Sequence, residues 1–201
     1  MRRRLNLGAL SIVLIVIVGS LLFSIMAGGK LDPASVEANG FCLERVGASS
    51  PDWQTAIVTA SAVADVPLER LWTVWSKLED WPAWSGGLIE SAHWTQGAEW
   101  TEGAQFQQVL HLRFPIGRYT SRETVHVAKP GESVAWWNTS RGVKYCHTWT
   151  FEALSLTRTR ITDSDVFHGR LAGVLKGLLT RAWERSFQSS VDGLIRRAGG
   201  Q

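Results

Sequence analysis

The chain has 201 residues, of which 45% are hydrophobic and 19% charged, and this balance excludes a disordered or collagen-like protein. The formal net charge is +3, and Arg2, Arg3 and Arg4 account for all of it. The rest of the chain is neutral, so no basic footprint for nucleic acid is expected. The 11 tryptophans are many for this length and predict a core or pocket rich in indole rings.

The N-terminal segment has no charged residue from Leu5 to Gly29. As a helix, residues 5–27 would measure about 34 Å, enough to cross a hydrocarbon layer of about 30 Å. We therefore predict that residues 1–29 form a transmembrane anchor. The three arginines before it favour an inside N-terminus, which places the domain on the extracytoplasmic side. The small residues at its end keep open a signal peptide that is cleaved near Gly29, with export of the domain.

Residues 30–52 contain Pro, Gly, Ser and Asn without any period, and we interpret them as a tether. An oxidising compartment would permit a disulfide between Cys42 and Cys146, but sequence cannot establish pairing, and two unpaired thiols are the favoured expectation. The spacing of the cysteines and histidines does not suit a metal. With no P-loop or dinucleotide-binding glycine pattern either, we expect neither metal nor cofactor.

Regular patterns begin at Trp53. Residues 53–65 read as a strand, and Pro67 opens a helical pattern over residues 67–80 that stops at the W-P-A-W sequence of residues 81–84. We interpret that sequence as a loop that either plugs the fold or forms a lid or a membrane-facing lip. Six further strands, separated by turn residues, are predicted at residues 88–95, 104–114, 118–128, 133–139, 143–154 and 158–168. Residues 170–198 form a long amphipathic helix.

This order resembles the START-like or SRPBCC superfamily, the polyketide cyclase/dehydrase and lipid-transport group. The residues that carry the resemblance are A-D-V-P-L-E-R-L-W at 64–72, D-W-P-A-W at 80–84, G-E-S-V-A-W at 131–136 and T-R-I at 159–161. It covers residues 53–198 and implies an α+β helix-grip fold, in which a curved antiparallel sheet of about seven strands wraps a long C-terminal helix around an apolar cavity. Most members bind hydrophobic molecules and a minority are enzymes. The predicted membrane helix departs from the soluble members.

Strand alternation assigns side chains to the face that looks toward the last helix. Val125 and Val127 are both expected on this face, whereas Cys146 is expected on the opposite one, which disfavours a Cys-His nucleophile. The predicted cavity residues are Trp84, Phe106, Leu110, Tyr119, Glu123, Trp136, Asn138, His147, Trp149, Asp163, Asp165, Phe167, Leu175, Leu179 and Trp183.

These observations favour a membrane-anchored binding or carrier protein whose partners are the membrane, through residues 5–27, and a hydrophobic small molecule that is lipid-like or polyketide-like. One alternative is a cyclase or dehydratase in which His147 and Asp165 act as a hydrogen-bonded acid/base pair. Another is an envelope structural protein with a filled core. A cavity large enough for a ligand would argue against the last alternative.

Overall fold

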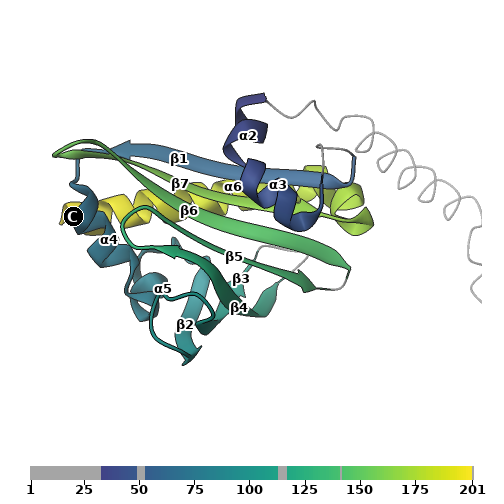
Figure 1. Cartoon of the computed structure of the whole chain (residues 1–201), viewed down its shortest axis with the longest axis horizontal. Helices are drawn as coiled ribbons and strands as arrows, with labels where there is room; N and C mark the ends of the chain where they lie inside the picture. The colour runs from purple at the N-terminus through teal and green to yellow at the C-terminus, as the bar shows by residue number, and fades with distance from the viewer. Residues whose placement is uncertain (1–32, 49–52, 113–116, 141, 201) are drawn as a thin grey trace, which may run out of the picture.

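The computed structural model describes residues 33–48, 53–112, 117–140 and 142–200 (Figure 1). The predicted anchor, residues 1–29, lies outside the described residues. Within the described residues, no helix is both long enough and apolar enough to cross a membrane.

The described residues form an open antiparallel sheet of seven strands in the order β1-β7-β6-β5-β4-β3-β2. Each strand pairs antiparallel with its neighbours, as alternating apolar and polar residues bounded by turn residues predict, with register shifts in the β2–β3, β4–β5 and β6–β7 pairs. The strands are β1 (Thr55–Ala64), β2 (Ile89–Gln96), β3 (Gln105–His111), β4 (Arg118–Lys129), β5 (Ser133–Ser140), β6 (Val143–Ser155) and β7 (Arg158–His168). All seven predicted strands are confirmed within a few residues.

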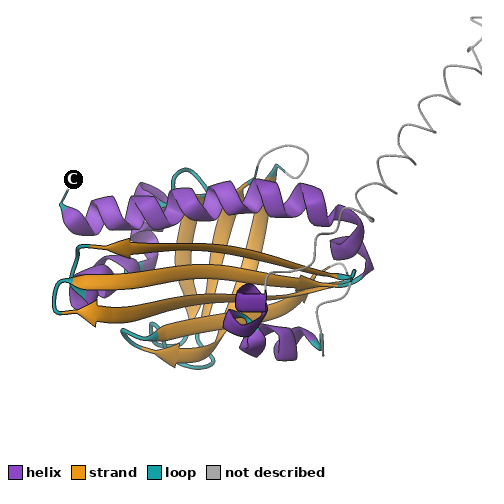
Figure 2. Ribbon diagram, turned by 90° about the horizontal axis from the view of Figure 1, so that it is seen from above, coloured by secondary structure: helices purple, strands orange, loops and turns teal. Residues whose placement is uncertain are grey.

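The C-terminal helix α6 (Arg170–Gly199) runs along the inner face of the sheet (Figure 2). Its buried residues Phe187, Val191 and Leu194 belong to the main hydrophobic core, together with the inward side chains of the strands. A long apolar stripe on one helix and a one-sided apolar sheet are each buried only when they meet, which explains this two-layer packing. The α+β helix-grip arrangement is therefore confirmed.

The first helical pattern is shorter than predicted. Helix α4 (Leu68–Trp75) ends five residues early, and a 3-10 turn, η1 (Leu78–Asp80), and helix α5 (Trp81–Trp84) follow it. The indole N–H of Trp81 donates to the carbonyl of Trp75 at 2.6 Å, and that of Trp100 donates to the carbonyl of Ser76 at 2.5 Å. These donors satisfy carbonyls that a longer helix would have bonded itself, so buried indoles end the helix here.

The N-terminal helices α2 (Pro33–Ala38) and α3 (Gly40–Val46) occupy part of the segment that was predicted to be a tether. They lie on the sheet face opposite α6 (Figures 1 and 2). Cys42 on α3 and Cys146 on β6 form a disulfide, so the expectation of unpaired thiols was wrong. Around it, apolar side chains of α3, β1, β6 and β7 form a second, smaller core. The segment is thus packed and covalently fixed.

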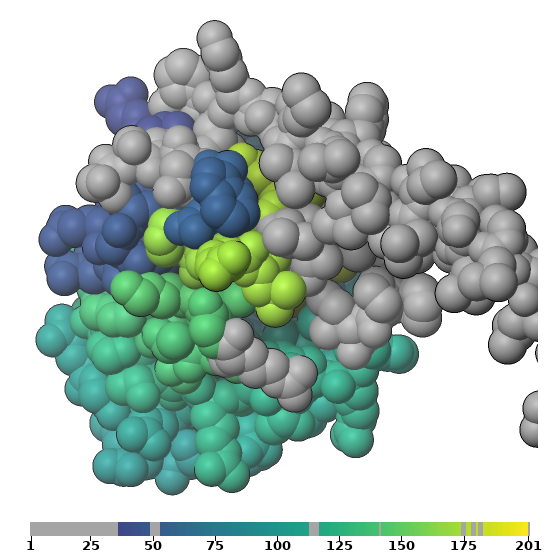
Figure 3. Space-filling model, turned by 90° about the vertical axis from the view of Figure 1, so that its right-hand side faces the viewer, coloured from purple at the N-terminus to yellow at the C-terminus, as the bar shows by residue number. Residues whose placement is uncertain are grey.

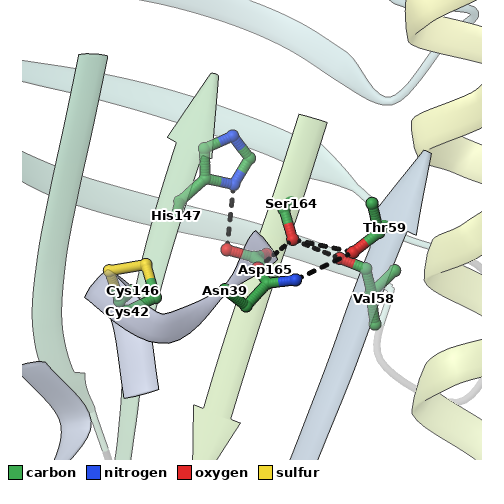
Figure 4. Close-up of a disulfide and its surroundings, with 8 residues drawn as sticks. All are labelled: Asn39, Cys42, Val58, Thr59, Cys146, His147, Ser164 and Asp165. Carbon is green, nitrogen blue, oxygen red and sulfur yellow. Dashed lines mark hydrogen bonds and ion pairs between the residues drawn. A yellow bond between two sulfur atoms is a disulfide. The ribbon is translucent and has the colours of Figure 1, made fainter. Parts of the chain in front are cut away.

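Asn39, between α2 and α3, adds polar contacts to this attachment (Figure 4). Its side-chain oxygen accepts a hydrogen bond from Ser164 on β7, and its nitrogen donates to Thr59 on β1 at 3.4 Å. Because alternate residues of a strand face opposite sides, Ser164 points outward while its neighbours on either side point into the fold. The N-terminal helices are therefore attached to the outer face of strands whose inner face lines the interior of the fold.

The register shift in β4 reverses a face that the sequence predicts. The pairing of β4 with β5 shifts between Val125 and Val127, which is a β-bulge. After the bulge Ala128 pairs with Val134 and contacts the main core, while Val127 pairs with Ala135 on the outer face. A single extra residue inverts the faces that follow it, so the inward assignment of Val127 was wrong.

Helices α5 and α6 meet at Gly193. A Cβ atom at this position would overlap the carbonyl oxygen and carbon of Trp84. Beside it, the hydroxyl of Ser190 donates to the carbonyl of Ser85 at 3.0 Å. The close approach of two backbones requires glycine at position 193, where the helix itself would favour alanine.

We therefore predict that Gly193→Ala destabilises the protein by about 2 kcal/mol or more, because the two helices must separate. Thermal unfolding of the full chain in lipid nanodiscs, followed by tryptophan fluorescence, should show a melting temperature lower by about 5 °C or more. The matched control is Gly177→Ala on the same helix, where a Cβ meets nothing within 4 Å and stability should hold or rise slightly. Equal behaviour of the two variants would contradict this packing.

Candidate ligand-binding cavity

A cavity of about 460 Å³ lies between the inner face of the sheet and α6. It extends to the end of the molecule where the β5–β6 turn and the start of α6 lie side by side (Figure 3). Its aromatic lining comes from Trp81, Trp84, Tyr119, Trp136, Tyr145, Trp149, Phe167, Trp183 and Phe187. Its aliphatic lining comes from Leu88, Ile89, Leu110, Leu112, Val143, Leu171 and Ala172. Its polar lining comes from Gln108, Ser121, Glu123, Ser140, His147, Asp163, Asp165 and Ser190.

The structure brings most of the predicted cavity residues together. Those that line the cavity are Trp84, Leu110, Tyr119, Glu123, Trp136, His147, Trp149, Asp163, Asp165, Phe167 and Trp183. Phe106 is buried behind the lining, with its ring 5.3 Å from that of Trp136. Asn138 is exposed at a strand end, where it donates to the backbone carbonyl of Arg122. The side chains of Leu175 and Leu179 lie outside the described part of the structure.

Sequence reasoning left out several lining residues. Ser121 lies on β4 between Tyr119 and Glu123 at the spacing that shares a face, so strand alternation could have identified it. Tyr145 lies on the inward face of β6 with His147, as strand alternation predicts, and it also lines the cavity. Trp81 and Trp84 are buried cavity residues on a short helix, and the lid and lip interpretations of this segment have no support in their burial.

His147 on β6 is held between two carboxylates of β7. The register of the two strands pairs His147 with Asp165 and Trp149 with Asp163. His147 Nδ1 lies 2.9 Å from Asp165 Oδ1 in a hydrogen bond, and Nε2 lies 3.0 Å from Asp163 Oδ1 at ion-pair distance but without hydrogen-bond geometry. The predicted contact with Asp165 is therefore present, and Asp163 adds a second contact.

This surrounding fixes the charge of the imidazole. Burial lowers the pKa of His147, but the fields and contacts of Asp165 and Asp163 outweigh it and raise the pKa to about 10. Burial raises the pKa of Asp163 to about 6, against the opposing pull of the imidazole. At neutral pH the group is thus an imidazolium shared by two carboxylates, and a protonated ring cannot act as a general base. The indole of Trp136 stacks on it at 4.3 Å.

A second polar group is centred on Glu123 of β4. The hydroxyl of Tyr145 lies 2.6 Å from both carboxylate oxygens, and the hydroxyl of Ser121 also donates to Oε1. Burial raises the pKa of Glu123 to about 7 in spite of these hydrogen bonds, and burial and the carboxylate together raise the pKa of Tyr145. Both partners of Glu123 are neutral, so its negative charge has no direct counter-ion within the described part of the chain.

The acids of the cavity are arranged around the imidazole and the hydroxyls. Among the described residues, no three histidine, cysteine or acidic side chains are grouped so that they could hold a metal ion. These acids can offer hydrogen-bond acceptors and negative charge to a ligand at one place on the aromatic wall of the cavity. The indole N–H of Trp84, which has no hydrogen-bond partner in the described structure, adds a donor.

A curved antiparallel sheet that closes over a long helix and leaves a cavity defines a helix-grip protein. Residues 55–199 match the family described as polyketide cyclase / dehydrase and lipid transport. The chain belongs to this family, which confirms the resemblance found in the sequence. No curated protein sequence is significantly similar to the chain.

Solved structures with this fold include three instructive cases. The Zhui aromatase/cyclase from Streptomyces sp. R1128 is 16% identical with a TM-score of 0.58, over 72% of this chain and 94% of that one. A START superfamily protein from Mycobacterium smegmatis is 11% identical with a TM-score of 0.59, over 72% and 97%. The major latex-like protein 151 from Panax ginseng is 8% identical with a TM-score of 0.60, over 72% and 98%. At these identities the similarity shows the fold alone.

The raised pKa of Glu123 predicts how pH acts on stability. An acid whose pKa rises on folding, here from 4.5 to about 7, contributes stability that is present below pH 4.5 and lost as pH rises through about 7. Glu123→Gln removes this dependence, so the variant should gain stability relative to the unchanged protein between pH 4.5 and pH 8. Melting temperatures of the full chain in nanodiscs across this range measure it.

The control for this titration is Glu152→Gln, which removes an exposed carboxylate paired with Arg160 on the same sheet. It should leave the pH profile unchanged. His147 and Asp163 also have raised pKa values and contribute in the same direction, so the comparison uses the difference between variants. A Glu123→Gln profile parallel to that of the unchanged protein would contradict the assignment.

Proposed function

We propose that this chain is a membrane-anchored protein that binds a hydrophobic small molecule, lipid-like or polyketide-like, between the sheet and α6. The observation that carries the proposal is the cavity of about 460 Å³, which lies within the usual size range of ligand sites. Its walls are mainly aromatic and aliphatic, and a few polar groups converge at one place. This pattern is typical of a site that holds an apolar body and orients one polar group.

The anchor and the localisation are part of the proposal. The uncharged segment of residues 5–27 would hold the chain in the membrane, and the arginines before it would keep the N-terminus inside. The disulfide between Cys42 and Cys146 supports an oxidising, extracytoplasmic location for the domain. Cleavage near Gly29, with release of the domain, is the alternative.

The other functions considered from the sequence have weaker support. In the cyclase or dehydratase alternative, the two flanking carboxylates keep the ring of His147 protonated near neutral pH, which disfavours it as a general base and leaves it only the role of a general acid. An envelope protein with a filled core would pack its interior to normal density, and the cavity argues against it.

Filling the cavity should abolish binding. Leu110 lines the cavity on β3, so Leu110→Trp places an indole in the space that the ligand would occupy. The full chain, purified in native lipid discs, is extracted with organic solvent, and the extract is compared by mass spectrometry. We expect one class of hydrophobic molecule to be present with the unchanged chain and largely depleted with Leu110→Trp.

The matched control is Gln105→Trp, an outward and exposed position on the same strand, which should retain the bound molecule. Bulk lipids of the discs are extracted equally from all three samples, which distinguishes them from a molecule that is bound in the cavity. Identical extracts from the three proteins would contradict binding in this cavity.

The anchor and the disulfide can be tested together on the intact chain from a membrane fraction. We expect an intact mass that includes residues 1–29 and no thiol that reacts with a maleimide under denaturing conditions. After reduction, two maleimides should be added per chain, because both cysteines are then free. A mass that begins near Lys30 would favour the cleaved form, and two reactive thiols before reduction would contradict an oxidising location.

A further inference from the structure

The charge of the cavity lining is unbalanced. Three acids, Glu123, Asp163 and Asp165, line the cavity together with a single histidine, and its described lining contains no lysine or arginine. His147 already contacts both aspartates, through a hydrogen bond with Asp165 and an ion-pair contact with Asp163. One positive charge therefore serves three carboxylates, and the cavity is negative by one or more charges near neutral pH.

Within the described residues, Glu123 is the acid of the cavity that has no positively charged side chain in direct contact. It is 2% exposed, and its hydrogen-bond donors Tyr145 and Ser121 are neutral hydroxyls. Burying a carboxylate without a counter-charge is costly, which is why burial raises its pKa. A cation brought next to Glu123 would remove the cost.

Asp163 gives an independent sign of an unfilled site. Its side chain is almost fully buried and lines the cavity, yet Oδ1 has only the 3.0 Å ion-pair contact with His147 Nε2, and neither of these two atoms has a hydrogen bond with the described residues. Buried carboxylate oxygens usually accept hydrogen bonds. A donor group on a ligand in the cavity would supply the missing one.

The walls around these acids suit a cation as well. Aromatic faces attract positive charge when the site excludes water, and tryptophan does so most strongly. Five of the rings that line the cavity are indoles, from Trp81, Trp84, Trp136, Trp149 and Trp183. The stacking of Trp136 on the imidazolium of His147 is one such contact within the protein.

We propose that the cavity selects hydrophobic ligands that carry a positive charge, an apolar body with a protonated amine, over neutral and anionic analogues. The amine would lie near Glu123 and donate toward the carboxylates, while the apolar body contacts the indole rings. This inference rests on the proposed function and names the chemical class of its ligand. A fatty acid or an acidic lipid headgroup would add a negative charge to a site that already has an excess, and would be rejected.

Three probes of similar size separate the charge from the apolar body: 2-(1-naphthyl)ethylamine, 2-(1-naphthyl)ethanol and the carboxylate 1-naphthaleneacetate. Each is titrated calorimetrically at pH 8 into the full chain in phosphatidylcholine nanodiscs, and the heat of empty discs is subtracted to remove partitioning into lipid. We expect the amine to bind about tenfold or more tightly than the alcohol, as a charged hydrogen bond provides, and the carboxylate to bind most weakly.

Two substitutions test whether Glu123 causes the preference for the amine. Glu123→Gln keeps the shape and removes the charge, so the amine should lose about tenfold in affinity while the alcohol is little changed. Glu152→Gln, the same change on an exposed strand position, should leave all three affinities unaltered. The melting temperature of each variant shows that it is folded.

The outcomes separate this inference from the proposed function. Binding of all three probes with equal affinity, or tightest binding of the carboxylate, would overturn the charge selection and leave a hydrophobic binding site in place. A preference for the amine that survives in Glu123→Gln would overturn the role of that residue. No binding of any probe to the cavity, with Leu110→Trp giving the same heats as the unchanged chain, would count against both.

Discussion

The contact between His147 and the two aspartates is the constraint on which the rest of the structure depends. Asp163 and Asp165 are buried at the inner face of the sheet with the largely buried His147 between them, and pairing offsets the cost of removing these charges from water. Pairing requires β6 and β7 to be adjacent in the register that sets His147 opposite Asp165. A slip of β6 by one residue would turn His147 outward and Cys146 inward, and a slip of β7 would turn both aspartates outward and Ser164 inward.

The outer face of the same two strands carries the attachment of the N-terminal helices. Cys146 precedes His147 and bonds to Cys42, and Ser164 lies between the two aspartates and bonds to Asn39 (Figure 4). The strands that form the polar end of the cavity are therefore the strands that α2 and α3 hold from outside. The disulfide therefore links a strand of the cavity wall covalently to α3.

Much of this fold can be predicted from the sequence because each strand or helix shows a periodic pattern of apolar residues along its whole length. The seven strands, the long helix α6 and the inward positions of Glu123, His147 and Asp165 all come from periodicity and turn residues. The features that could not be predicted each depend on a single contact or insertion, which leaves no repeating pattern in the sequence. Cys42 and Cys146 are 104 residues apart, and only the packing of α3 on β6 brings them together.

The smaller differences between the predicted and the observed structure have the same cause. One inserted residue in β4 reverses the face of Val127, and two indole donors end α4 early. Asn138 has the right parity for the cavity, but it is exposed and its side-chain nitrogen donates to the backbone carbonyl of Arg122 on the neighbouring strand. The second contact of His147, with Asp163, was not foreseen because both aspartates had the same parity and only the geometry shows that each meets a different ring nitrogen.

The most direct test of this account is the protonation state of His147 in the folded protein. Nitrogen-15 NMR of the full chain, with histidine labelled and His147→Gln used to assign the signal, distinguishes an imidazolium from either neutral tautomer. The account predicts that both ring nitrogens of His147 carry protons at pH 8, because the pKa is raised to about 10 by two carboxylates. A neutral ring at that pH would contradict the shared imidazolium, and with it the argument that His147 cannot act as a general base.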